Sequence, residues 1–204
     1  MACLRERKQL WGASGITLPA EYRLPNFGEL EQARTFADVR GAWSGEGLAF
    51  TAEVTGKRHP VWCRDTRLED SDSLQLWIDT RDTHNIHRAS RFCHRFVFMP
   101  AGGGRGHAEP IAEQLLINRA RENAPPVPPK LLKVRAELRK DGYRLEAFLP
   151  AKTLAGFSPS DHPRLGFTYA VYDRELGLQT FSVGTGYPFD EDPSTWGTLE
   201  MVAS

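Results

Sequence analysis

The sequence predicts an all-β protein, a two-sheet antiparallel β-sandwich of the jelly-roll or immunoglobulin-like type with a few short helices. Two observations predict this class. Eight short segments of strand-forming residues are separated by turn residues, a spacing typical of sandwiches and barrels. In addition, Asp141-Gly142 lies between two runs of alternating apolar residues and predicts a tight hairpin, in which this pair would supply a positive φ.

The predicted strands follow one another with few helices between them. They cover residues 47–54, 73–80, 91–100, 133–140, 143–150, 165–173, 178–184 and 197–202. Helices are predicted at 27–36 and 111–120, and one helical turn at 150–157, which Pro150 would start. The helices are therefore additions to a β body.

The segment 73–80 is the most informative of these strands. Because side chains of a strand point alternately to opposite faces, Leu74, Leu76 and Ile78 form one aliphatic face. The opposite face carries an amide, an indole and a carboxylate, from Gln75, Trp77 and Asp79. A stacking surface with hydrogen-bonding groups suits a hydroxyl-rich ligand.

One domain accounts for most of the chain. We expect residues 1–35 to form an irregular N-terminal lead-in and residues 36–204 to form the sandwich domain, since no internal repeat is present. Lysine plus arginine equals aspartate plus glutamate at 26 each, so neither nucleic acid nor a membrane surface is an expected partner. The first residues lack an apolar run and a cleavage pattern. We therefore expect a cytoplasmic protein with reduced cysteines.

Five segments, in sequence order, resemble the family 9 carbohydrate-binding modules and their DOMON-like relatives. They are residues 43–50 (WSGEGLAF), 72–79 (DSLQLWID), 141–150 (DGYRLEAFLP), 166–173 (GFTYAVYD) and 196–199 (WGTL). The resemblance spans residues 43–202 and implies a β-sandwich that binds carbohydrate without catalysis. It also allows a structural calcium ion, which the family often binds.

In that family two tryptophans hold a terminal sugar between them. At the matching positions this sequence has Glu69, three residues before Asp72, and Asp190, two residues before Asp192. Neither tryptophan is therefore carried over. One polar position does match in kind, because Gln75 stands where the family commonly has glutamate.

The candidate ligand is a carbohydrate or a related small polar molecule, and no cofactor is predicted. Trp62 and Arg64 lie in a loop where an aromatic ring beside arginine is typical of interaction sites. Arg95 alternates with phenylalanines in 91–100 and would project beside the polar face of the neighbouring strand. The full set of candidate ligand-binding residues is Trp62, Arg64, Gln75, Trp77, Asp79 and Arg95.

Other functions remain open from the residues alone. The sandwich could be a structural or protein-interaction domain with no sugar site, and a Cys63–Cys93 disulfide is an alternative to free thiols. A zinc site could use nitrogen and sulfur ligands from Cys63, His84, His87, Cys93 and His94. No motif for nucleophilic, phosphoryl-transfer or metalloprotease chemistry is present, so we assign no catalytic residue and expect no enzyme activity.

Overall fold

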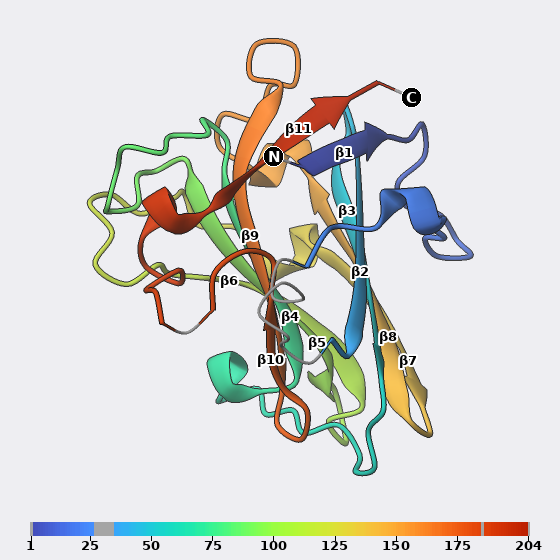
Figure 1. The fold of residues 1–204 in the computed structure, drawn as a ribbon. Helices are drawn as coiled ribbons and strands as arrows, with labels where there is room; N and C mark the ends of the chain where they lie inside the picture. The colour runs from blue at the N-terminus through green and yellow to red at the C-terminus, as the bar shows by residue number, and fades with distance from the viewer. Residues whose placement is uncertain (1, 27–34, 185, 204) are drawn as a thin grey trace.

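The computed structural model describes residues 2–26, 35–184 and 186–203, and this part of the chain is all-β (Figure 1). The strands are β1 (Ala2–Glu6), β2 (Ala37–Ser44), β3 (Gly47–Thr55), β4 (Ser73–Asp79), β5 (Cys93–Gly103), β6 (Glu109–Leu115), β7 (Lys133–Arg139), β8 (Gly142–Pro150), β9 (Arg164–Asp173), β10 (Gly177–Thr180) and β11 (Gly197–Val202). Short 3-10 turns are η1 (Ala20–Tyr22), η3 (Leu68–Asp70), η4 (Pro129–Leu131), η5 (Ala151–Thr153) and η6 (Pro193–Thr195). The described residues contain no α-helix. Their 3-10 turns lack the length and the apolar sequence that a membrane-spanning helix needs.

The described strands form one hydrogen-bonded path that folds into two layers (Figure 1). Their order is β6-β5-β4-β9-β11-β1-β2-β3-β8-β7, with β10 beside β9. We call β6, β5, β4 and β9 the β4 layer, and β2, β3, β8 and β7 the β3 layer. Because β6 also contacts β7, the sheet is nearly closed. The predicted fold class is confirmed, with one difference: β1 pairs in parallel with both β11 and β2.

Aliphatic and aromatic side chains fill the space between the two layers. Leu74, Leu76 and Ile78 are fully buried there, as their alternation predicts. The rings of Phe50 on β3 and Phe167 on β9 stack with centroids 5.6 Å apart. Full burial of each such side chain contributes about 1.5–3 kcal/mol to stability. Burial of these side chains therefore holds the two layers together.

Two local expectations differ from the structure. Residues 2–6 of the predicted irregular lead-in form strand β1, a short strand in which Ala2 and Leu4 are buried. The helix predicted at 111–120 is wrong, because residues 109–115 form strand β6 at the end of the sheet path. The helix predicted at 27–36 lies mostly outside the described residues. The single turn predicted at 150–157 is present as η5.

The hairpin between β7 and β8 is confirmed, although its glycine acts for another reason. Arg139 pairs with Gly142, which leaves two residues in the turn, and neither Asp141 nor Gly142 has a positive φ. A Cβ at Gly142 would lie 1.9 Å from the carbonyl oxygen of Val54. Glycine is therefore needed here because β8 approaches the β3 backbone closely.

A buried ion cluster joins the segment after β3 to the ends of β4 and β9. The Lys57 Nζ lies 3.0 Å from the Asp72 carboxylate and 2.6 Å from the Asp173 carboxylate. All three side chains are at most 3% exposed. Burial alone would lower the pKa of Lys57, but the hydrogen bonds to Asp173 and Asp72 outweigh it and raise this pKa. Lys57 therefore stays charged in the fold.

We expect Lys57→Met to destabilise the protein by about 3–5 kcal/mol, because two buried carboxylates would lose their counter-ion. Chemical denaturation followed by tryptophan fluorescence measures this loss. Lys152→Met, at an exposed position, is the matched control and should change stability by less than about 0.5 kcal/mol. Equal stabilities of the two variants would contradict the structural role of Lys57.

Candidate functional site

The outward face of the β4 layer is covered by loops. Trp77 points away from the core, as predicted, but it is fully buried. Its ring meets the Phe189 ring edge to face at 5.5 Å, and its Nε1 donates a hydrogen bond to the Asp190 carbonyl oxygen. The loop that carries these two residues therefore closes over Trp77, whose ring is not available as a stacking platform.

Four side chains on this face form what we call the Arg95 cluster: Glu69, Gln75, Trp77 and Arg95. The guanidinium of Arg95 donates to Glu69 Oε1 at 2.8 Å and to Gln75 Oε1 at 2.9 Å. Its Cζ lies 5.0 Å from the centre of the Trp77 ring. Pairing of Trp77 with Arg95 across β4 and β5 positions these groups. The structure thus brings together three of the predicted residues and adds Glu69.

Exposure differs sharply across the Arg95 cluster. The Arg95 side chain is 4% exposed and Gln75 is fully buried, whereas the Glu69 side chain is 60% exposed. Arg95 Nε has no hydrogen-bond partner among the described residues.

Half-buried Tyr172 lies nearby on β9, and burial chiefly raises the pKa of its phenol while Arg95 lowers it. The phenol therefore stays neutral and can donate a hydrogen bond.

Glu69 and Tyr172 were missed as site residues by the sequence reasoning. Glu69 carried a signal, because it occupies a position where the resembled family has a sugar-holding tryptophan. Tyr172 lies on the outward face of β9 and pairs with Ser73 of β4, so a correct alignment of β4 with β9 would have indicated it.

Trp62 and Arg64 lie in a different group of side chains. The Cζ of Arg174 is 4.3 Å from the centre of the Trp62 ring, and that of Arg64 is 5.9 Å from it. Trp62 also lines a cavity of about 280 Å³ with Lys57 and Arg174. Among the described residues, neither Trp62 nor Arg64 hydrogen-bonds to the Arg95 cluster. The structure does not join the predicted residues into one site.

Asp79 stabilises the turn that follows β4. Its two carboxylate oxygens accept hydrogen bonds from the backbone N–H groups of Arg81 and Thr83, at 2.9 and 2.8 Å. The side chain is 1% exposed. The contacts of this carboxylate are therefore to its own turn.

The five candidate zinc ligands do not converge. The described residues contain no group of three histidine, cysteine or acidic side chains that could hold a metal ion. His84 hydrogen-bonds to Thr198, and His87 to Asp192. Cys63 and Cys93 are free thiols, and burial raises the pKa of Cys63 to about 12 and that of Cys93 to about 11. A zinc ion needs three or four converging ligands, which the described residues do not provide, and the disulfide alternative is not formed.

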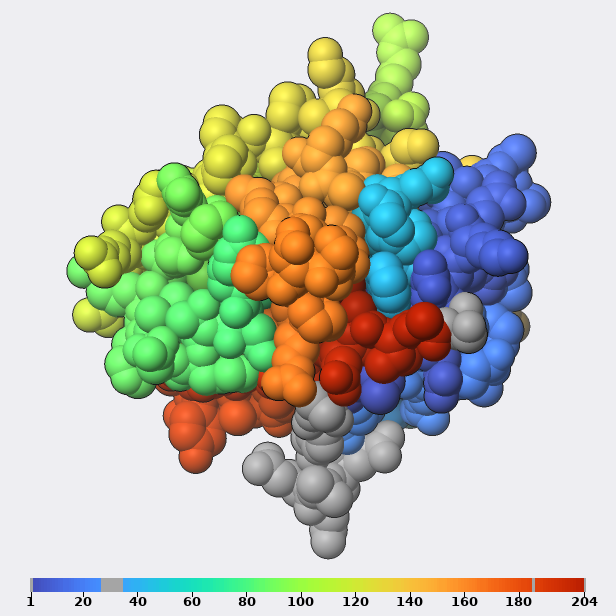
Figure 2. Space-filling model, turned by 90° about the horizontal axis from the view of Figure 1, so that it is seen from above, coloured from blue at the N-terminus to red at the C-terminus, as the bar shows by residue number. Residues whose placement is uncertain are grey.

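The remaining zinc candidate, His94, joins β5 to the segment that follows η5. Its Nε2 accepts a hydrogen bond from the backbone N–H of Ala155 at 3.0 Å, and Thr80 Oγ1 donates to the Ala155 carbonyl oxygen. Seen from above, the segment that follows η5 (orange) lies between the 80–92 loop (green) and the β2–β3 turn (cyan) (Figure 2). Burial lowers the pKa of His94 to about 4, so the ring is neutral in the fold.

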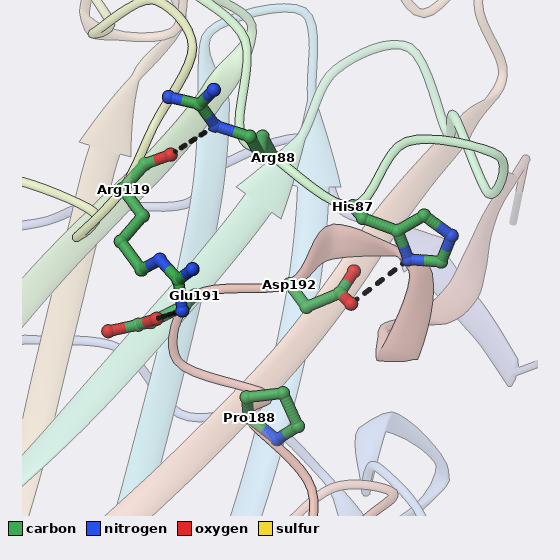
Figure 3. A pocket seen from close by; sticks show the side chains of 6 residues that line it. All are labelled: His87, Arg88, Arg119, Pro188, Glu191 and Asp192. Atoms are coloured by element: carbon green, nitrogen blue, oxygen red, sulfur yellow. Dashed lines mark hydrogen bonds and ion pairs between the residues drawn. The ribbon is translucent and has the colours of Figure 1, made fainter.

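A cavity lies between the loops that cover the β4 layer (Figure 3). Its volume is about 550 Å³, enough for a sugar ring, and it is lined by His87, Arg88, Arg119, Pro188, Glu191 and Asp192. These residues already pair with one another: Asp192 with His87 at 3.1 Å, and Glu191 with Arg119 at 4.0 Å. The side chains of His87 and Arg119 are mostly exposed, so surface side chains form much of this wall.

Solved structures with the same fold include carbohydrate-binding modules. A family 9 carbohydrate-binding module from Caldicellulosiruptor kristjanssonii, in complex with cellotriose, matches with a TM-score of 0.64 and 14% identity, covering 100% of this chain and 94% of that one. A module of the same family and organism, in complex with glucose, matches with a TM-score of 0.56 and 16% identity, over 84% and 80% of the two chains.

A candidate carbohydrate-binding protein from Bacteroides uniformis matches with a TM-score of 0.52 and 14% identity, over 81% of this chain and 79% of that one. The chain matches no protein-family model and no curated protein sequence. At these identities the matches define the fold: it is the β-sandwich of the family 9 modules, as the sequence resemblance predicts.

We expect the contribution of His94 to stability to fall by about 3 kcal/mol between pH 6.5 and pH 4, because His94 binds a proton more readily in the unfolded chain than in the fold. The folded-state pKa of about 4 lies below the unfolded value. The contribution of this ring is therefore complete above about pH 6.5 and is lost as the pH falls through 4.

Urea unfolding across this pH range measures the effect of His94. His94→Gln should flatten the slope of stability against pH, whereas His59→Gln, at an exposed position, should leave it unchanged. A slope that is identical in wild type and His94→Gln would refute the assignment.

Proposed function

We propose that this protein is a non-catalytic binding domain for carbohydrate or a related small polar ligand, and that the ligand binds at the Arg95 cluster. The observation that carries the proposal is the guanidinium of Arg95, held against Trp77 and Gln75 beneath the solvent-exposed Glu69. A rigid fork of donors next to an acceptor is suited to sugar hydroxyls and carboxylates.

Each part of the Arg95 cluster has a distinct role in this proposal. Trp77 supports the guanidinium from below, since its ring is buried and cannot stack on a sugar. Arg95, which lies just beneath the exposed carboxylate of Glu69, supplies the hydrogen-bond donors. Half-buried Tyr172 on β9 lies near enough for the charge of Arg95 to lower the pKa of its phenol, and it offers an aromatic surface to the ligand. With one partly covered ring in place of two tryptophans, less sugar surface is desolvated, so the affinity should be modest.

The fold supports a binding role of this kind. The two Caldicellulosiruptor structures are carbohydrate-binding modules with cellotriose and glucose bound, and this chain lacks catalytic sequence motifs. A structural or protein-interaction role is the alternative, and it is the outcome if no sugar binds.

We expect at least one sugar of a panel of neutral and acidic monosaccharides and cello-oligosaccharides to bind with a Kd of about 10–1000 μM. Titration calorimetry measures this binding. Arg95→Lys should weaken it at least about tenfold, because lysine keeps the charge but loses the planar fork of donors. Circular dichroism of the variant checks that it is folded.

Arg119→Ala is the matched control for this experiment, because Arg119 lines the 550 Å³ cavity and has a mostly exposed side chain. It should leave the affinity unchanged. Loss of binding in Arg119→Ala with normal binding in Arg95→Lys would move the site to that cavity. Absence of any sugar binding would remove the proposed function.

A further inference from the structure

The charge of Arg95 is balanced by a surface side chain. Its only ion-pair partner among the described residues is Glu69, at 2.8 Å, and that side chain is 60% exposed while Arg95 is 4% exposed. A buried guanidinium requires an anion nearby, because an unpaired buried charge is strongly destabilising. Here the anion comes from a residue that can rotate into solvent without unfolding its surroundings.

The backbone around Glu69 would stay in place during such a rotation. Its carbonyl oxygen accepts a hydrogen bond from Gln75 Nε2 at 3.2 Å, and Gln75 itself is fully buried. The neighbouring Asp70 is tied to Arg67 at 2.5 Å. Only the side chain of Glu69 needs to move, which is a rotamer change at the surface.

The space that the Glu69 carboxylate occupies is therefore suited to another carboxylate. An incoming carboxylate would meet the same guanidinium in the same place, and the charge beside Arg95 would be unchanged by the exchange. Asp190 and Asp70 contribute negative charge near Tyr172. The carboxylate of Glu69 pairs with Arg95 despite these charges, so they do not prevent another carboxylate from taking its place. A hydroxyl group could not replace the lost counter-ion.

We propose, building on the function proposed above, that the ligand is an acidic sugar of the uronate class. Its carboxylate displaces that of Glu69 and pairs with Arg95, while its ring remains at the rim beside Tyr172. The Glu69 carboxylate thus competes within the molecule for Arg95 and lowers the apparent affinity for the acidic sugar. The exchange involves no covalent step.

The test compares methyl glucuronide with methyl glucoside, which differ only in a carboxylate against a hydroxymethyl group. Calorimetry on the wild type should show at least about tenfold tighter binding of the glucuronide. Glu69→Gln removes the competitor and should tighten glucuronide binding by about threefold or more, with no tightening for the glucoside. Glu46→Gln, at an exposed turn position, should behave as wild type.

Thermal unfolding provides a second measurement. Unliganded Glu69→Gln should have a lower Tm than Glu46→Gln, because Arg95 loses its counter-ion, and methyl glucuronide should raise the Tm of Glu69→Gln more than that of the wild type. Equal affinity for the two glycosides, or weaker glucuronide binding by Glu69→Gln, would overturn this inference and leave the proposed function standing. Absence of binding by every sugar in the panel would remove both.

Discussion

The position of the candidate site depends on the ammonium group of Lys57, held between two buried carboxylates. Lys57 lies two residues after the end of β3, and Asp72 directly precedes β4, so the ion pair closes residues 57–72 into a loop. Asp72 also accepts hydrogen bonds from the backbone N–H groups of Trp62 and Arg174. Because Glu69 lies within this loop, the closure delivers its carboxylate to the face where Arg95 is buried.

The same ion pair explains two of the residues that carry the resemblance to the family. Asp72 opens the DSLQLWID segment and Asp173 ends the GFTYAVYD segment. Both are buried against Lys57 rather than turned to a ligand. Asp173 further accepts hydrogen bonds from the N–H groups of Glu175 and Leu176. The matching acids are therefore structural, which is why the resemblance predicts the fold more firmly than the ligand.

Alternation along the strands made part of this structure predictable. It placed Leu74 and Ile78 in the core and Gln75 and Arg95 on the other face, because a strand has only two faces. It failed for β6, whose alanine, glutamate, glutamine and leucine also favour helix and whose neighbour Leu116 is 66% exposed. Because only Ala112 of β6 is buried, the strand has no row of buried apolar residues that would distinguish it from a helix in the sequence.

The site could be predicted only in part, because its contacts depend on loops. Glu69 reaches Arg95 from η3, a short turn with no strong sequence signal. Trp62 is held by Arg174, a residue far along the chain, so the loop sequence alone suggested an open interaction site. Trp77 was correctly placed outward, but its cover comes from the loop around Phe189.

Strand β1 has a consequence for the order in which the fold can assemble. It lies between β11 and β2 in the sheet path, and its partners on β11 are distant in sequence, with Ala2 beside Leu199. Pairings of such long sequence separation are slow to form, because the chain entropy must be lost before the contacts are made. During synthesis, the join between the two halves of the path must therefore wait until residues 199–202 have left the ribosome.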